Sequence, residues 1–157
     1  MRAGLFFFLF AFFLPVVAHA QTRACTEMGC ENGISFTVDP AQEWKNGQYE
    51  ISLALDYKKV ICRGELPLNA CEDGPTFYCD DKDVTIIESG CALPKDQHAI
   101  GGIKINEEPN KVIVRVARNY RTMVTRTIVP QYQTLIPNGA GCGPVCRSAS
   151  YDLFSAN

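Results

Sequence analysis

The fold is indicated most clearly by residues 111–129, KVIVRVARNYRTMVTRTIV. Val112, Val114 and Val116 fall on one face of an extended chain, because successive side chains of a strand point to opposite faces. A turn at residues 119–120 and a return segment rich in threonine and β-branched residues complete the pattern. The stretch therefore predicts a β-hairpin with one buried face.

The same alternation recurs along the chain. In residues 49–56, Tyr49, Ile51, Leu53 and Leu55 share one face. After the first 20 residues, no stretch carries the apolar spacing and end signals of a helix of ten residues or more. Short strands at close intervals predict an all-β fold, a disulfide-stapled β-sandwich of immunoglobulin-like or related Greek-key topology. Further strands are predicted at residues 34–38, 59–63, 84–88, 100–105 and 131–136.

Residues 1–20 have the pattern of a secretory signal peptide. Arg2 precedes an apolar run over residues 5–17, and Ala18-His19-Ala20 is a small-x-small cleavage site. The run is shorter than the roughly 20 residues that a membrane-spanning helix needs. We therefore expect a secreted or periplasmic protein in which residues 21–157 form a single β-rich domain, with no membrane span after cleavage.

Eight cysteines follow the predicted leader, and an even number in an exported chain predicts four disulfides. Sequence alone leaves 105 possible pairings. Among them, the first two and the last two cysteines could each close a small loop, and the middle four could pair among themselves. Zinc and thioredoxin-like chemistry are disfavoured because no C-x2-C pair is present. The eight are Cys25, Cys30, Cys62, Cys71, Cys79, Cys91, Cys142 and Cys146.

Charge is divided unevenly along the chain. Residues 21–100 hold 14 acidic and 7 basic side chains, whereas residues 101–157 hold 3 acidic and 7 basic ones. The hairpin arginines form either a patch for an anionic partner or a solvated outer face paired with the acidic half. A nucleic-acid partner is not expected, because the formal net charge is -2. The predicted ligand-binding residues are Arg115, Arg118, Arg121 and Arg126, together with Asn138 in the glycine-rich loop.

Candidates for metal binding and catalysis are few. Asp80, Asp81 and Asp83 offer oxygen ligands suited to calcium, but they lack the spacing of an EF-hand loop, so no metal and no cofactor are assigned. His98 is the one histidine after the leader, and its polar surroundings predict an exposed turn residue. No catalytic residue is assigned, since no G-x-S-x-G motif accompanies it.

Two long loops, residues 64–83 and 137–147, each contain two cysteines. Loops carry binding function more often than the elements that they connect, and disulfides lower the entropy lost when such loops bind. We therefore expect a non-enzymatic binding module whose partner is a protein or a polysaccharide. Two alternatives remain open: an inhibitor of a secreted hydrolase that inserts residues 137–146, and a small hydrolase that uses a pair of carboxylates.

Overall fold

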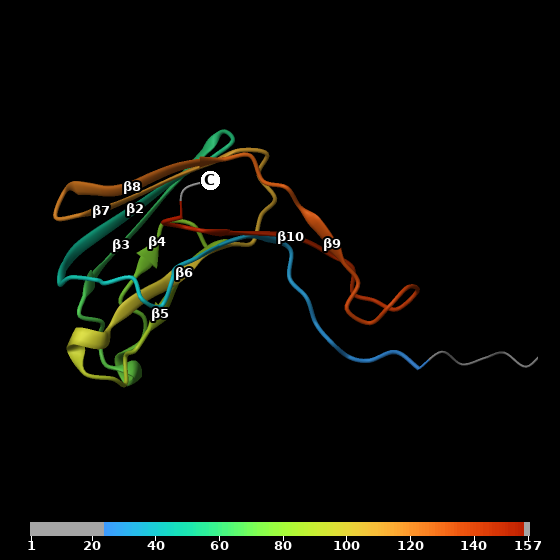
Figure 1. Ribbon diagram of the computed structural model, residues 1–157, viewed down its shortest axis with the longest axis horizontal. Helices are drawn as coiled ribbons and strands as arrows, with labels where there is room; N and C mark the ends of the chain where they lie inside the picture. The colour runs from blue at the N-terminus through green and yellow to red at the C-terminus, as the bar shows by residue number, and fades with distance from the viewer. Residues whose placement is uncertain (1–23, 156–157) are drawn as a thin grey trace, which may run out of the picture.

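Two five-stranded β-sheets face each other in the computed structural model, which describes residues 24–155 (Figure 1). The signal peptide predicted at residues 1–20 lies outside the described residues. The first sheet has the order β5-β6-β1-β10-β9, and the second has the order β4-β3-β2-β7-β8. The all-β, two-sheet prediction is confirmed. The elements are β1 (Gly33–Thr37), β2 (Gly47–Leu55), β3 (Lys58–Leu66), the 3-10 turn η1 (Cys71–Asp73), β4 (Tyr78–Cys79), β5 (Val84–Ser89), the 3-10 turn η2 (Lys95–Gln97), β6 (Ala99–Ile105), β7 (Val112–Arg118), β8 (Arg121–Ile128), β9 (Gln133–Leu135) and β10 (Cys146–Asp152).

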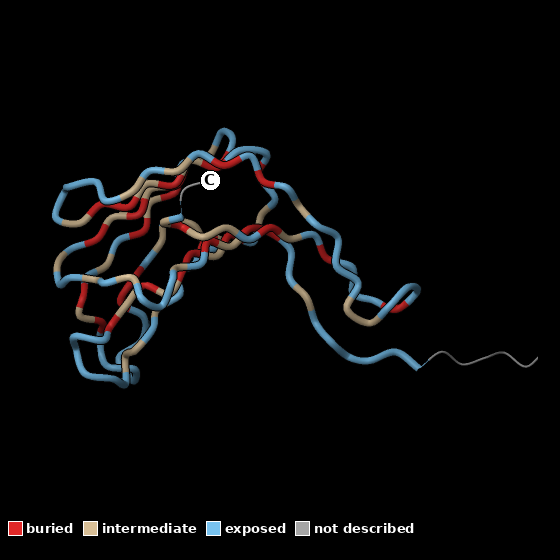
Figure 2. Tube along the Cα trace, in the orientation of Figure 1, coloured by how far each residue is buried: buried red, intermediate tan, exposed pale blue. Residues whose placement is uncertain are grey.

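The two strands with the clearest alternation, β2 and β7, lie side by side in the second sheet. They run antiparallel, with Ile51 opposite Val116 and Leu53 opposite Val114. These apolar residues are buried, and their side chains face the first sheet. The residues between them alternate with them in burial, as the colours of the two strands show (Figure 2). The turn between β7 and β8 falls at residues 119–120, as the sequence predicts. One face of the second sheet is thus core, and its outer face remains available to solvent.

The first sheet is held together at its centre by β1. This strand pairs antiparallel with β6 and parallel with β10, so that Phe36 lies opposite both Ile103 and Tyr151. Strand β10 was not predicted, because its sequence CRSASYD lacks the alternation of large apolar residues. Its neighbours on both sides supply the backbone hydrogen bonds that keep such a polar segment extended.

Trp44 packs against one end of the hydrophobic core. The centroid of its ring lies 5.5 Å from that of Tyr49 and 5.7 Å from that of Phe154, and both pairs have an edge-to-face arrangement. The Tyr49 hydroxyl donates a hydrogen bond to the backbone carbonyl of Lys45 at 2.6 Å. Burial raises the pKa of Tyr49 above its ordinary value. The second sheet is therefore sealed at this end by aromatic packing.

The predicted strand boundaries differ from the observed ones in a few places. The strand predicted at residues 59–63 extends over Lys58–Leu66, and that predicted at 131–136 shortens to Gln133–Leu135. The two-residue strand β4 was not predicted, since it depends on pairing with β3 rather than on a pattern of its own. An immunoglobulin-like strand order stays a prediction.

Candidate functional site

The eight cysteines form four disulfides, as expected. The middle four pair among themselves, as Cys62–Cys79 and Cys71–Cys91. The small loops that the first two and the last two cysteines could have closed do not form. Instead, the two N-terminal cysteines bond to the two C-terminal ones, as Cys25–Cys142 and Cys30–Cys146. The reason is the parallel pairing of β1 with β10, which brings the segments before these two strands together.

These two disulfides fasten an arm that extends from one end of the sandwich (Figure 1). We call it the clamped arm: it consists of residues 24–32 and residues 133–147. Within it, β9 pairs with the beginning of β10, and the chain between them turns at Gly139 and Gly141, both of which adopt left-handed backbone conformations. Cys142 and Cys146 are buried although most residues around them are exposed (Figure 2). These two cysteines are the buried residues of the clamped arm, so one half of each disulfide supplies its interior.

Asn138 joins the two segments of the clamped arm through its side chain. Its amide oxygen accepts hydrogen bonds from the Thr26 hydroxyl at 2.5 Å and from the Met28 N–H at 3.0 Å. Its amide nitrogen donates to the carbonyls of Met28 at 2.9 Å and Gly143 at 2.6 Å. The four hydrogen bonds match the full capacity of an asparagine side chain. Asn138 was predicted to bind a ligand, which stays a prediction; the role visible here is to position the arm.

The base of the clamped arm is tied to the sandwich by charged groups. The Arg147 guanidinium bonds Glu108 at 2.8 Å and lies over the ring of Tyr132 at 5.4 Å. Glu31 pairs with Lys104 of β6. Burial, followed by the nearby carboxylate of Glu108, raises the pKa of Tyr132 to about 12. Within the arm, the charged groups at the base are therefore already paired, which leaves Glu27 as the one ionisable side chain farther out.

The outer part of the clamped arm exposes apolar side chains. Met28 and Val145 are 53% and 59% exposed, and Leu135 and Ile136 are exposed to a lesser extent. Leu135 lies opposite Cys146 in the β9–β10 pairing, which sets it close to Val145. The arm therefore combines a covalent frame with a partly apolar surface on which Glu27 is the one charged side chain beyond the base.

The four predicted arginines do not share one face of the hairpin. Arg115 lies opposite Ser52 on the outer face, and its Nε donates to the Thr122 hydroxyl at 2.8 Å. Arg126 lies opposite the buried Val114, and its Nη1 donates to the carbonyls of Asp152 and Ser155 near the C-terminus. Arg118 lies opposite the buried Tyr49, and Arg121 lies opposite Arg118 at the turn. Ligand binding by these residues stays a prediction, and only Arg115 contributes to the groove described next.

A groove of about 540 Å³ lies on the second sheet. We call it the outer-sheet groove. The outward side chains of three neighbouring strands contribute to it, and the small, buried Ala117 is among its lining residues. Glu50 and Arg63, opposite each other on β2 and β3, form an ion pair at 3.0 Å. The lining residues are Gln48, Tyr49, Glu50, Arg63, Gly64, Glu65, Asn69, Thr76, Arg115, Ala117 and Tyr120.

One side of the groove is held by the β3–β4 connection. The Thr76 hydroxyl accepts a hydrogen bond from the Asn69 N–H at 2.8 Å. The N–H groups of Thr76 and Phe77 both donate to one carboxylate oxygen of Glu88, each at 2.7 Å. Glu88 belongs to β5 of the other sheet. Charge-assisted hydrogen bonds of this kind fix the connection across the edge of the sandwich.

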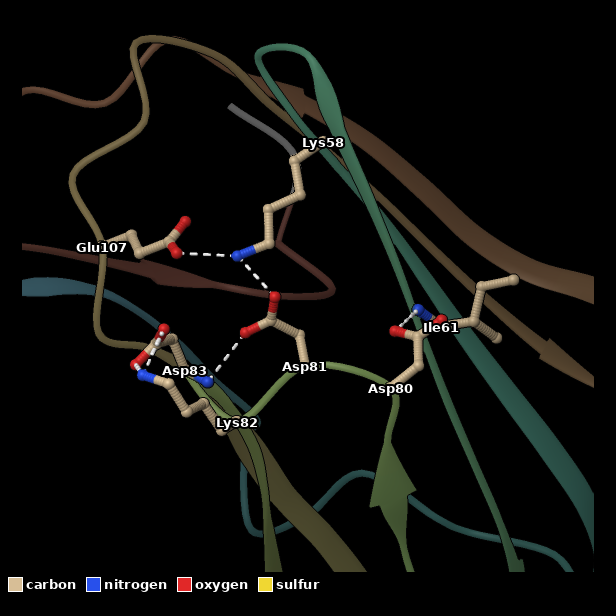
Figure 3. A network of polar contacts seen from close by, with 7 residues as sticks. All are labelled: Lys58, Ile61, Asp80, Asp81, Lys82, Asp83 and Glu107. Atoms are coloured by element: carbon tan, nitrogen blue, oxygen red, sulfur yellow. Dashed lines mark hydrogen bonds and ion pairs between the residues drawn. The ribbon is translucent and has the colours of Figure 1, made fainter.

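Two of the three calcium candidates, Asp81 and Asp83, lie with Glu107 in an acidic cluster that also contains a lysine ammonium group (Figure 3). The Lys58 ammonium is 2.5 Å from Asp81 and 2.7 Å from Glu107. Asp83 pairs with Lys82 at 3.1 Å, while Asp80 turns away and accepts the Ile61 N–H at 2.8 Å. Hydrogen bonding to Asp81 raises the pKa of Lys58 above its ordinary value, and hydrogen bonding to Lys58 lowers the pKa of Asp81 below its own. Calcium binding by Asp80, Asp81 and Asp83 stays a prediction.

His98 is buried, so the expectation of an exposed turn residue is wrong. It is 6% exposed, because η2 folds back and places it at the start of β6. Its Nε2 lies 3.0 Å from the carbonyl oxygen of Leu93, which can only accept a hydrogen bond from this nitrogen. Its Nδ1 has no partner among residues 24–155. No free cysteine lies within that part of the chain, so a cysteine–histidine pair does not form there.

Sequence reasoning missed two contributors to these sites. The segment of residues 24–32 was given no role, although Cys25 and Cys30 required partners somewhere in the chain. Glu107 was not grouped with the aspartates, because it follows them by more than twenty positions and reaches them from the β6–β7 connection. The even number of cysteines could have indicated that residues 24–32 are bonded to another part of the chain. Nothing in the sequence near Glu107 indicates its place beside the aspartates.

Two further observations complete the description. Within residues 24–155, no helix has the length and apolar character required to cross a membrane. Comparison with protein-family models, with curated proteins and with solved structures gives no match.

Proposed function

We propose that this protein is a secreted or periplasmic, non-enzymatic binding module that recognises a protein partner through its clamped arm. The observation that carries the proposal is the arm itself, a convex extension fastened by Cys25–Cys142 and Cys30–Cys146. A convex, rigid element fits a concave site on a partner. Its covalent frame reduces the conformational entropy that would be lost on binding.

The surface chemistry of the arm supports a protein partner with an apolar pocket. Ile136 and Val145 are exposed on the outer part, whereas Glu31 and Arg147 at the base are already paired with the sandwich. Inserting the outer part into a pocket would bury apolar surface, and Glu27 is the one charged side chain there that would have to stay in water. Apolar anchors at the centre of an interface are where binding energy concentrates.

The test is site-specific photo-crosslinking in secreted and envelope fractions. A benzophenone side chain introduced at Ile136 should form a covalent adduct with one defined protein, and the same group at Thr85, an exposed residue of β5, should not. The double substitution Ile136→Asp and Val145→Asp should reduce capture by about tenfold or more, because it places charge in an apolar pocket. The melting temperature should stay within a few degrees of the wild type, since both positions are exposed.

Equal adduct formation at Ile136 and Thr85 would show that the arm is not the recognition surface. If a benzophenone side chain forms no adduct from either Ile136 or Val145, in both the secreted and the envelope fraction, a protein partner at this surface is refuted.

Inhibition of a secreted hydrolase is a second candidate, and the same geometry favours it. Residues 137–146 form the projecting turn between β9 and β10, and they carry the cysteine that bonds Cys25. A rigid turn of this kind fits the cleft of a hydrolase. If the crosslinked partner is a hydrolase, its activity should fall on addition of the wild-type protein and recover with the Ile136→Asp, Val145→Asp variant. An unchanged activity at saturating protein would exclude inhibition.

A further inference from the structure

The outer-sheet groove lies on a different surface from the clamped arm and has a different chemistry. Its volume, about 540 Å³, lies in the range of sites for small molecules. Its lining includes two glutamates, Glu50 and Glu65, and two arginines, Arg63 and Arg115. The formal charges of these four side chains cancel. A groove of this kind does not select an anion or a cation by its overall charge, and its many donors and acceptors suit a neutral, polar ligand.

The hydrogen-bonding groups of the groove are arranged in rows across the strands. Gln48 lies opposite Glu65, and Glu50 lies opposite Arg63, on one face of β2 and β3. The ion pair between Glu50 and Arg63 fixes the centre of this array. Beside this ion pair, the carboxylate of Glu65 has no hydrogen-bond partner within residues 24–155. The Arg115 guanidinium makes one hydrogen bond, from its Nε to the Thr122 hydroxyl. A free carboxylate and a free guanidinium edge thus flank a preorganised centre.

Tyr120 stands at the rim of this array with its ring almost fully in solvent. It is 92% exposed and lines the groove. Asn119 and Tyr120 have φ values of 47° and 64°, in the left-handed region that side chains other than glycine rarely adopt. The turn is held in place by Asn119, whose side-chain oxygen accepts the Gln48 N–H at 3.0 Å.

The two-residue turn between β7 and β8 requires a positive φ at position 120, but it does not require a tyrosine side chain. An aromatic residue in the left-handed region is strained, and a ring that is exposed gains little packing in return. Asparagine or glycine would fit this turn better. Such a combination of strain and exposure beside a groove indicates a side chain kept for recognition.

We infer that the outer-sheet groove binds a neutral saccharide, with the Tyr120 ring against a pyranose face and Glu65 and Arg115 bonded to its hydroxyl groups. A pyranose presents an apolar face of C–H groups, which pairs with an aromatic ring, and an edge of hydroxyls that each donate and accept. Carboxylate and guanidinium groups are planar and bind neighbouring hydroxyls in pairs. Neither an anionic nor a cationic sugar gains from the net charge of the lining, because two arginines balance Glu50 and Glu65, so neutral sugars are favoured.

The test is titration calorimetry of the full protein with four neutral probes, maltohexaose, cellohexaose, laminarihexaose and chitohexaose, and with one anionic probe, hexagalacturonate. At least one neutral probe should bind with a dissociation constant below about 10 mM, and more tightly than the anionic probe. Tyr120→Asn should weaken that binding by about tenfold or more, because the stacking ring is lost. The same variant should unfold at an equal or higher temperature, because asparagine tolerates the left-handed backbone.

The matched control is Tyr57→Asn. Tyr57 is also fully exposed, at 106%, in the turn between β2 and β3, and it does not line the groove. Its substitution should leave affinity within about twofold of the wild type. The arm variant Ile136→Asp, Val145→Asp should also bind the sugar normally, which separates this inference from the proposed protein partner.

Three results would overturn the inference. They are the absence of heat with all four neutral probes, tighter binding of hexagalacturonate, or equal affinity in wild type and Tyr120→Asn. Hydrolysis of a bound probe that disappears in Glu50→Gln would replace a binding groove by a hydrolase site that uses carboxylates.

Discussion

The ring of Phe77 packs directly on Gly64, so that a β-carbon at position 64 would lie 2.5 Å from Cγ of the ring. Gly64 belongs to β3, and Phe77 belongs to the connection that leads into β4. The same ring lies 6.5 Å from that of the buried Tyr49. The glycine therefore allows the β3–β4 connection, and with it one side of the outer-sheet groove, to approach the sheet closely.

Gly64→Ala should destabilise the protein by about 1–3 kcal/mol, because the added methyl group overlaps the base of a rigid ring rather than a flexible side-chain end. Urea denaturation gives the measurement. The control is Gly101→Ala in β6, where the nearest atoms to a β-carbon lie at 3.5 Å, an ordinary contact. That variant should change stability by less than about 0.5 kcal/mol. A similar loss in both variants would contradict the packing argument.

Asn138→Ala should loosen the clamped arm and leave the sandwich intact. The Met28 N–H loses its acceptor, so hydrogen exchange at this amide should accelerate by about tenfold, while amides of β2 and β7 should not change. Asn138→Asp should loosen the arm more than Asn138→Ala does, because a carboxylate oxygen would then face the carbonyl oxygens of Met28 and Gly143. Asn46→Ala, at an exposed position, is the control. Unchanged Met28 exchange would disprove the role of Asn138.

The two arm disulfides should be partly redundant in their contributions to stability, because they close nearly the same loop. Cys25–Cys142 spans 117 positions and Cys30–Cys146 spans 116. When one is present, the other closes only the small ring between them, so removing either alone should cost about 3 kcal/mol. Removing both opens the large loop as well and should cost about 7–8 kcal/mol in the same chain-entropy treatment. Urea denaturation of the two serine double variants and of the quadruple variant tests this, and simple additivity would contradict it.

The ion pair between Lys58 and Asp81 should make stability depend on pH at the acid end. The pKa of Asp81 is lowered in the folded protein, whereas in the unfolded chain it is about 3.9. The pair therefore stabilises the fold above about pH 4, and this contribution is lost as the pH falls through the lowered pKa. The pKa of Lys58 is raised, so its contribution is complete below about pH 10.4 and is lost as the pH rises through the raised value.

Asp81→Asn removes the acid-side contribution. The urea midpoint of this variant should be lower than that of the wild type at neutral pH, and the difference should shrink as the pH falls below about 4. Asp96→Asn, in the exposed η2 turn, is the control and should follow the wild type. A difference between Asp81→Asn and wild type that is constant at all pH values would contradict the assignment.

Local patterns account for the parts of the fold that the sequence predicts well. In β2 and β7, the alternation of apolar and polar residues in the sequence is enough to predict which side chains are buried, among them Ile51, Leu53, Val112, Val114 and Val116. Strand β10 carries no such pattern, since its extended form depends on β1 and β9. His98 was misplaced for a related reason: polar neighbours indicated a solvent-exposed turn, yet the turn itself carries the ring inward.

The candidate sites depend still more on distant partners. The cysteine count predicts four disulfides, but the pairing of Cys30 with Cys146 follows only from the parallel register of β1 and β10. The outer-sheet groove requires the registers of three strands at once, so that Glu50, Arg63 and Ala117 become neighbours. Neither relationship has a counterpart in local composition.

The parallel pairing of β1 with β10 also sets the order in which the molecule can assemble. Gly33 lies beside Ser148, so the middle of the first sheet stays open until residues 148–152 have been synthesised. A chain that crosses a membrane from its N-terminus would emerge with β1 lacking this neighbour until β10 arrives. The disulfides Cys62–Cys79 and Cys71–Cys91, whose partners are 17 and 20 positions apart, are free to form during that interval, whereas those of the arm must wait for its end. The arm is therefore completed only after Cys142 and Cys146 have been synthesised, so the surface proposed to bind a partner forms later than the second sheet.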